Sequence, residues 1–220
     1  MSQRILVWDI PTRVFHWALV LSFVGAFLTS ETERTRDLHL MLGYLMLGLI
    51  AFRLVWGLVG SRYARFASFL FSPTETLAYV KSLYQRTPRH YLGHNPAGAW
   101  SIFLLLSLGL LACGSGVGLV LESGGELFEE PHETLAYAML AVVFVHVAGV
   151  VVSSLLHHEN LVGAMVSGHK SGEADQGIAR HFGWLGVIMA IIIASFLMLY
   201  QPSGTSTAGI GTSSTHHEED

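Results

Sequence analysis

The chain has 220 residues and a formal net charge of −4 with neutral histidines, and its composition is 51% hydrophobic but only 13% charged. Charged residues make up about a quarter of a typical soluble domain. This depletion, with a mean hydropathy of +0.49, favours a membrane protein. The single cysteine, Cys113, excludes a disulfide framework, a cysteine-ligated iron–sulfur cluster and the Cys-x-x-Cys-His attachment of a c-type haem.

Five apolar runs approach the roughly 20 residues with which a helix crosses a bilayer. No small-residue cleavage site follows the first run, so we expect it to be retained rather than removed as a signal peptide. The sequence therefore predicts an all-α membrane protein with five spans. In chain order the runs are Val14–Ser30, Leu38–Val59, Gly98–Leu121, Thr134–Leu156 and Phe182–Tyr200.

The segment between the second and third runs has a pattern of its own. Ser72-Pro73-Thr74-Glu75 is typical of a capping box with proline in the first helical turn. Apolar residues then recur at helical spacing, which predicts a short helix on the membrane surface, with a solvated connector as the alternative. At the other end of the chain, residues 201–220 are rich in Gly, Ser and Thr and predict a disordered tail.

The distribution of positive charge predicts an orientation. Of the 12 Lys and Arg residues only Arg34 and Arg36 fall on one side of the predicted membrane. The positive-inside rule therefore places the N-terminus in the cytoplasm and the C-terminus in the periplasm of a bacterial inner membrane. The outer connection between the third and fourth runs is acidic, with Glu122, Glu126, Glu129, Glu130 and Glu133.

Twelve histidines are too many to share one function, so we sorted them by expected depth. Eight fall in connections, at helix ends or in the tail, where a solvated or interfacial role is the default: His90, His94, His157, His158, His169, His181, His216 and His217. Four lie inside spans or at their mouths: His16, His39, His132 and His146. A lone histidine near a helix end is more often snorkelling or hydrogen-bonded than a ligand, but ionisable groups within a membrane are usually functional.

The mutual geometry of these four histidines favours cofactor binding. His132 and His146 are 14 residues apart, which is close to four helical turns and about 21 Å on one helix face. His16 is expected level with His146 at the inner side, and His39 level with His132 at the outer side. Each pair offers two imidazoles from facing helices, which predicts two non-covalent b haems that transfer single electrons.

Small and basic residues near these positions fit the same hypothesis. Glycines could let a flat macrocycle approach the backbone, although close helix packing is the alternative. Arg13 and Arg53 are positioned where the propionates of the inner haem could end, and snorkelling explains them equally well. The glycines are Gly43, Gly48, Gly114, Gly116, Gly118 and Gly149.

Several motifs together resemble the bacterial cytochrome b561 and nickel–iron-hydrogenase cytochrome b superfamily. The opening is Val7-Trp8-Asp9-x-Pro11-Thr12-Arg13-x-x-His16-Trp17, and the later motifs are His39-x-x-x-Gly43-Tyr44, Arg53-x-x-Trp56-Gly57-x-x-Gly60, Ala64-Arg65-Phe66, His94-Asn95-Pro96-x-Gly98 and Glu159-Asn160-Leu161-Val162-x-Ala164-Met165. The resemblance covers residues 7–170 and leaves the fifth run outside.

That resemblance implies a four-helix bundle with two bis-histidine b haems, whose ligand positions match His16, His39, His132 and His146. It also implies a quinone site beside the inner haem, where Asn95 and Gly98 would lie; a turn or helix cap is the alternative for Asn95. The expected organisation is a di-haem transmembrane bundle over residues 1–170, a fifth transmembrane helix over 171–200 that could dock another subunit, and the tail.

The expected function is electron transfer across the bilayer between a periplasmic partner and the quinone pool of a respiratory chain. The partner would be a c-type cytochrome or an oxidoreductase subunit, and the acidic outer connection would attract a basic protein. A nucleic-acid partner is not expected. One alternative is a self-sufficient quinone oxidoreductase that takes electrons from a small molecule such as superoxide. A proton or metal transporter is less favoured, because the span interiors contain no Asp or Glu.

Overall fold

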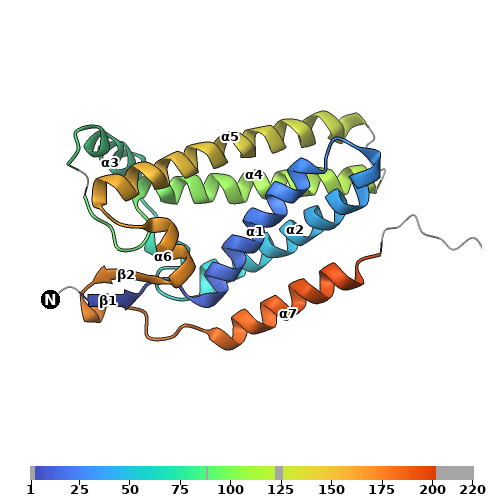
Figure 1. Ribbon diagram of the computed structural model, residues 1–220. Coiled ribbons are helices and arrows are strands. Elements are labelled where there is room, and N and C mark those ends of the chain that lie inside the picture. The colour runs from blue at the N-terminus through green and yellow to red at the C-terminus, as the bar shows by residue number, and fades with distance from the viewer. Residues whose placement is uncertain (1–2, 88, 122–125, 202–220) are drawn as a thin grey trace, which may run out of the picture.

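The computed structural model describes residues 3–87, 89–121 and 126–201. Four helices in this part of the chain are long and apolar enough to cross a membrane, and together they form a bundle (Figure 1). They are α1 (Ile10–Leu28), α2 (Arg36–Val59), α4 (Pro96–Val120) and α5 (Glu126–His157). The predicted all-α membrane fold is confirmed.

The packing order of the bundle follows the chain. Helix α1 packs on α2, α2 also contacts α4, and α4 runs along α5. Buried side chains from all four helices meet in one core, which includes Phe15, Ile50, Leu106 and Met139. Many large apolar side chains point outward instead, such as Leu28, which is 75% exposed. A soluble surface would make them a liability, whereas a bilayer solvates them.

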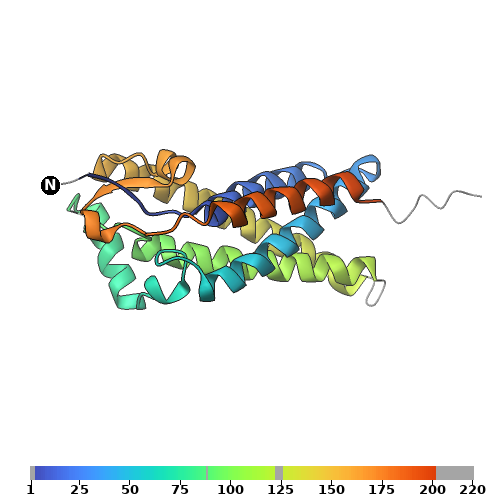
Figure 2. The same cartoon turned by 90° about the horizontal axis from the view of Figure 1, so that it is seen from below.

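The fifth predicted span is a shorter helix, α7 (Gly183–Leu199), which packs against α1 and α2 (Figures 1 and 2). Its 17 residues stand at the lower limit of the length that crosses the hydrocarbon core. Its first turn lies close against α1, because a side-chain carbon at Gly186 would overlap Ile10. That α7 crosses the membrane remains a prediction, and the predicted tail lies outside the described residues except for Gln201.

Polar segments gather at one end of the bundle, which we call the sheet end (Figures 1 and 2). Strands β1 (Gln3–Leu6) and β2 (His169–Gly172) pair antiparallel there, with Gln3 opposite Gly172 and Leu6 opposite His169. Helix α6 (Leu161–Ser167) and the single-turn helix Ala174–Gln176 flank this sheet. Two further single-turn helices lie on either side of α2 in the chain: Glu33–Thr35 before it and Phe66–Ser68 after it. No sequence pattern predicted this two-stranded sheet.

The surface helix predicted between the second and third runs is present as α3 (Pro73–Tyr84). Ser72 accepts a hydrogen bond from the backbone of Glu75, and the Glu75 carboxylate accepts one in return, so the capping box forms as the pattern indicated. Leu77 and Tyr84 are 70% and 91% exposed, and the Tyr79 hydroxyl lies 3.4 Å from Ser153 of α5. An apolar outer face of this kind suits the membrane surface.

Candidate functional site

Two of the four predicted ligands, His39 and His132, face each other at the end of the bundle opposite the sheet, which we call the far end. Their ring centroids are 6.0 Å apart. A metal bonds imidazole nitrogen at about 2 Å, so two imidazoles on opposite sides of one metal have centroids about 6 Å apart. The observed separation therefore suits one iron atom between the two rings.

Hydrogen bonds orient both of these imidazoles. His39 Nδ1 lies 2.8 Å from the Ala26 carbonyl oxygen, and His132 Nδ1 lies 2.9 Å from that of Ala112 and 3.2 Å from Ser115 Oγ. A donor bond from Nδ1 to a carbonyl fixes the tautomer and leaves Nε2 with its lone pair free for a metal. Both rings thus have the orienting contact that metal-bound histidines usually have.

The second predicted pair, His16 on α1 and His146 on α5, lies toward the sheet end. Both side chains are partly buried, and an electrostatic interaction couples the two rings. His16 Nδ1 is buried without a hydrogen-bond partner among the described residues. The structure therefore brings His16 near His146, as the 14-residue spacing on α5 indicated, with a buried nitrogen that a ligand could satisfy.

Glycines beside the ligands leave room for a flat group. A side-chain carbon added at Gly43 or Gly149 would meet nothing within 4 Å. These glycines follow His39 and His146 by four and three residues, so each shares a helix face with its histidine. Close helix packing does not account for these two glycines. The residues present fit the macrocycle of a haem at the far-end pair, where Gly43 is partly buried, whereas Gly149 is exposed, so at the sheet end the fit rests on the two imidazoles.

The motif at the start of the chain builds the scaffold of the sheet end. Asp9 is fully buried and accepts hydrogen bonds from Thr12 N at 2.7 Å, from Trp56 Nε1 at 3.3 Å and from the Ser61 hydroxyl. It therefore caps α1 and ties that helix to the end of α2. Because α1 carries His16, this contact sets the depth of one ligand.

A second set of contacts joins α1 to the segment that follows α5. Val7 N and Trp8 N both donate to the Gly168 carbonyl oxygen, at 2.8 and 3.0 Å, and Arg13 donates to the Val166 carbonyl. Gly168 adopts a left-handed φ of +83°, and a side-chain carbon there would lie 2.7 Å from the Trp8 carbonyl oxygen. The two helices that carry His16 and His146 are thus tied together at the sheet end.

The two predicted propionate partners differ in their surroundings. Arg13 is partly buried and donates from one amino group to Val166, while its Nε is buried and has no hydrogen-bond partner in the part of the chain that the structure describes. Arg53 is only 3% exposed, and its Nη1 lacks a hydrogen-bond partner among the described residues. Snorkelling does not describe Arg53, because a snorkelling side chain keeps its charge in water.

The two predicted quinone contacts pair with each other. Asn95 Oδ1 accepts a hydrogen bond from Gly98 N at 2.8 Å and caps α4, which is the alternative that the sequence left open. Its side-chain amide nitrogen has no described bond to a backbone group. A role of Asn95 and Gly98 toward quinone remains a proposal.

His94 is partly buried and packed among aromatic rings, although the sequence favoured a solvated or interfacial position for it. Its ring packs between Trp8 and Phe69, with centroid distances of 4.6 and 4.3 Å, and its Nδ1 is buried without a described partner. No local pattern marks this burial, because the two aromatic rings come from separate segments of the chain.

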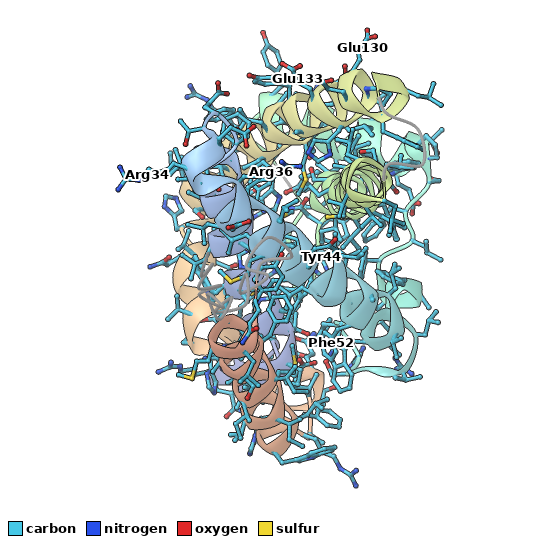
Figure 3. All side chains as sticks on the ribbon, turned by 90° about the vertical axis from the view of Figure 1, so that its right-hand side faces the viewer. Arg34, Arg36, Tyr44, Phe52, Glu130 and Glu133 are labelled. Carbon is cyan, nitrogen blue, oxygen red and sulfur yellow. The ribbon has the colours of Figure 1, made fainter. Side chains whose placement is uncertain are left out.

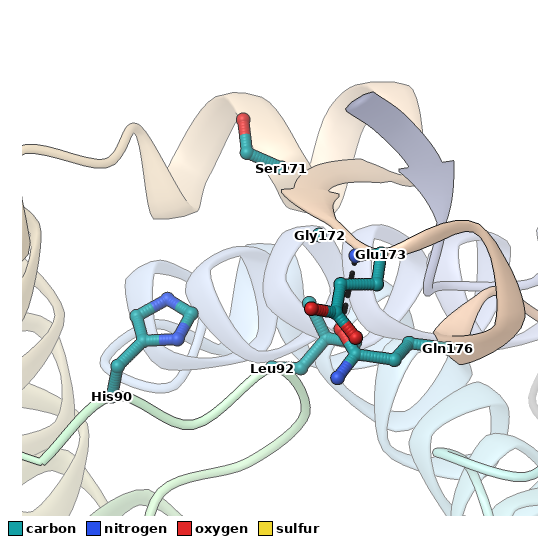
Figure 4. A pocket seen from close by; sticks show the side chains of 6 residues that line it. All are labelled: His90, Leu92, Ser171, Gly172, Glu173 and Gln176. Atoms are coloured by element: carbon teal, nitrogen blue, oxygen red, sulfur yellow. Dashed lines mark hydrogen bonds between the residues drawn. The ribbon is translucent and has the colours of Figure 1, made fainter. Parts of the chain in front are cut away.

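Other histidines at the sheet end form a surface contact rather than a ligand pair. His90 Nε2 lies 2.7 Å from Glu159 Oε1, and Lys170 Nζ lies 2.9 Å from Glu159 Oε2. A pocket of about 360 Å³ opens nearby, between the loop at His90 and the chain around β2 (Figure 4). None of the predicted site residues lines it; its walls are His90, Leu92, Ser171, Gly172, Glu173 and Gln176.

Charged side chains mark the far end, onto which Figure 3 looks directly. Glu130 and Glu133 project outward from α5, and Arg34 projects from the turn before α2. Three exposed glutamates of α5, including Glu129, stand within two turns of His132. The predicted acidic surface is present in its described part; residues 122–125 lie outside the described residues.

Comparison with known proteins identifies relatives over most of the chain. Residues 7–168 match the family described as prokaryotic cytochrome b561. Probable Ni/Fe-hydrogenase B-type cytochrome subunits are similar: that of Azotobacter vinelandii is 24% identical over 80% of this chain and 92% of its own length, that of Rhodobacter capsulatus is 24% identical over 78% and 83%, and that of Rhizobium leguminosarum bv. viciae is 23% identical over 76% and 89%. No solved structure matched significantly.

Proposed function

Because the chain belongs to the prokaryotic cytochrome b561 family, we propose that it carries electrons across the bilayer between a periplasmic redox partner and the quinone pool. It is a multi-pass membrane protein and a b-type cytochrome of electron transfer. Two haems, quinone and the periplasmic partner are the finer parts of the proposal. They are supported by the geometry of the histidine pairs and by the surface at each end of the bundle.

The observation that carries the proposal is the far-end pair. His39 and His132 stand 6.0 Å apart, and the Nδ1 of each contacts a backbone carbonyl. The sheet-end pair, His16 and His146, would hold the second haem through its two imidazoles, although His16 Nδ1 has no orienting partner among the described residues. A haem bound by two imidazoles has no open position for oxygen or substrate and supplies one-electron transfer. The helices exclude water around both pairs and hold the imidazoles at fixed depths.

The ends of the bundle would serve different redox partners. We assign the sheet end to the cytoplasm, since the positive-inside rule places the basic connections there. Quinone would react at that end, near His16 and His146, with Asn95 and Gly98 in the adjoining loop. Gly98 N already donates to Asn95 Oδ1, so the side-chain amide nitrogen of Asn95 is the donor that would bind a quinone carbonyl.

The far end would then face the periplasm, where the exposed glutamates of α5 attract a basic partner. A c-type cytochrome meets this requirement. The names of the similar proteins support a second kind of partner, a nickel–iron hydrogenase that delivers electrons to the cytochrome subunit. The direction of flow differs between the two, outward to a cytochrome and inward from a hydrogenase.

The test uses the purified full-length protein in proteoliposomes. Quinol in the bilayer should reduce the haems, which is followed by their visible absorbance, and an added basic c-type cytochrome should then reoxidise them. Reoxidation should slow as the salt concentration rises, because screening weakens the attraction to the glutamates. Glu130→Gln should slow the second step and spare the first, with Glu75→Gln in α3 at the other end as matched control. If quinol left the protein oxidised, the quinone-linked function would be wrong.

A further inference from the structure

Arg53 is a buried cation whose guanidinium is not fully hydrogen-bonded. The side chain is 3% exposed, and its Nη1 has no hydrogen-bond partner in the described part of the chain. The buried Asp9 carboxylate acts on it electrostatically, but it accepts its hydrogen bonds from Thr12, Trp56 and Ser61 rather than from the guanidinium. A buried donor left unsatisfied is costly, which favours a further anion at Nη1.

The guanidinium of Arg53 is held in place rather than free to reach the surface. It lies over the Phe66 ring, 4.7 Å from the centroid. Phe66 in turn sits directly on α2, where a side-chain carbon at Gly57 would overlap its ring. Gly57 follows Arg53 by four residues on the same helix face. The glycine and the aromatic ring therefore fix the direction in which the guanidinium points.

His94 supplies a second polar group beside it. Its ring lies 4.3 Å from that of Phe69, which in turn lies 5.9 Å from Phe66, the ring that Arg53 covers. The charges of Arg53 and Lys170 and the sheet-end imidazoles also act on His94 electrostatically. Burial first, and then the charge of Arg53, lower the pKa of His94 to about 3, so the imidazole is neutral at physiological pH. Trp8 and Phe69 both pack against the ring, and its Nδ1 has no hydrogen-bond partner among the described residues.

Lys170 does not compete for the same anion. Its Nζ is already bound by Glu159 Oε2 at 2.9 Å and by the Tyr91 carbonyl oxygen at 3.2 Å. Arg13 Nε is also unsatisfied, but Arg13 already donates to the Val166 carbonyl oxygen. Arg53 Nη1 and His94 Nδ1 are buried atoms with hydrogen-bonding capacity left over among the described residues, and they come from different elements, α2 and the loop before α4. Two such groups facing one oxyanion are the arrangement that binds a carboxylate or a phosphate.

We propose that Arg53 and His94 together bind one propionate carboxylate of the haem held by His16 and His146, which makes His94 a cofactor-binding residue. The inference rests on the proposed function, because it requires a haem at the sheet-end pair. A lipid phosphate offers similar chemistry but would have to leave the membrane surface to reach a side chain that is 3% exposed. A propionate approaches from within the bundle.

The test measures the midpoint potential of each haem by redox titration of the visible and electron paramagnetic resonance spectra. Arg53→Gln removes a positive charge near the ferric–ferrous couple and should lower the potential of the sheet-end haem only. For a charge roughly 12 Å from the iron at an effective dielectric of about 20, reduction becomes about tenfold less favourable, or about 59 mV for one electron. The far-end haem is the internal control.

His94 variants separate hydrogen bonding from packing. His94→Leu should lower the same potential by less than Arg53→Gln does, while His94→Gln, which keeps a donor, should stay close to the parent protein. Neither change removes an axial ligand, so His94→Ala should also retain both haems. The double variant Arg53→Gln/His94→Leu should shift less than the sum of the single changes, because both groups bind one carboxylate. Additive shifts, or equal shifts at both haems, would overturn the proposal.

Reconstitution with haem dimethyl ester distinguishes the source of the anion. Esterified propionates carry no charge and cannot pair with Arg53, so the parent protein should bind the ester more weakly than haem at the sheet end, whereas Arg53→Gln should bind the two more nearly equally there. If the parent protein and Arg53→Gln lost the same affinity on esterification, a lipid phosphate or another anion would bind Arg53 and the proposal would be wrong. If the variants lost both haems, the test would use the parent protein alone. The parent protein should bind the haem ester more weakly at the sheet end than at the far end, and equal binding at the two ends would refute the inference. A parent protein without a sheet-end haem refutes the proposed function instead.

Discussion

Gly116 lies against His132, the proposed far-end ligand, and replacing it by alanine tests that geometry. A side-chain carbon at this position would lie 3.1 Å from His132 Cε1 and 3.3 Å from Nδ1, closer than ordinary van der Waals contact. The imidazole must therefore shift by a few tenths of an ångström. That shift disturbs the Nδ1 contact with the Ala112 carbonyl, which orients the ring.

Loss of an orienting contact typically lowers metal affinity about 10- to 100-fold. We therefore expect Gly116→Ala to weaken the far-end haem by about 1.4 to 2.7 kcal/mol and to leave the sheet-end haem unchanged. Gly114 is the matched control, since it lies on the opposite side of α4 and a side-chain carbon there would meet nothing within 4 Å. Gly114→Ala should stabilise the helix by up to about 1 kcal/mol.

The assay follows haem transfer from each variant to excess apomyoglobin, with the two haems distinguished by their spectra. Faster loss of one haem is expected for Gly116→Ala alone. If Gly116→Ala retained both haems as firmly as the parent protein, or if Gly114→Ala lost haem equally fast, then Gly116 would not support His132 as a ligand.

Three further outcomes are expected. Among variants that keep one haem, His39→Ala should impair electron exchange with the external partner and spare quinone-linked reduction, whereas His16→Ala should do the reverse. Equal loss of both half-reactions in either variant would contradict the placement of one haem on each side of the membrane. A reporter fused after the last residue should be active in the periplasm, and one inserted in α3 in the cytoplasm; the reverse result would exchange the two ends. Burial alone would raise the pKa of Glu159, but hydrogen bonds from Lys170 and His90 lower it below its ordinary value. The ionised Glu159 therefore stabilises the fold at pH values above its unfolded-state pKa, and this stabilisation is lost as the pH falls through the lowered pKa of the folded state. Glu159→Gln should lower the free energy of unfolding by about 1–3 kcal/mol at neutral pH and by little in acid, as measured by thermal unfolding. A cost that did not change with pH would refute this.

The spans and the candidate ligands could be predicted because both depend on local or periodic features. Hydrophobic runs mark the membrane helices, and a 14-residue spacing on one helix places His132 and His146 on one face by geometry alone. The capping box before α3 is similarly local, since the side chains of Ser72 and Glu75 need only each other and the adjoining backbone.

Long-range contacts explain what the sequence could not indicate. Strands β1 and β2 have four residues each and lie more than 160 residues apart, so neither has a pattern long enough to mark it. The depth of His94 depends on Trp8 and Phe69, which reach it only after the loop and the N-terminal segment have folded. Asn95 has a short-range role as a helix cap, which the sequence offered as an alternative.

Haem content tests the central claim most directly. The purified chain should contain two b haems per polypeptide, both six-coordinate and low-spin in the reduced-minus-oxidised spectrum, because each iron has two imidazole ligands. Acid acetone should extract both, since the chain has no Cys-x-x-Cys-His sequence to bind them covalently. One haem per chain, or a high-spin fraction approaching half, would contradict the pairing of His39 with His132 and of His16 with His146.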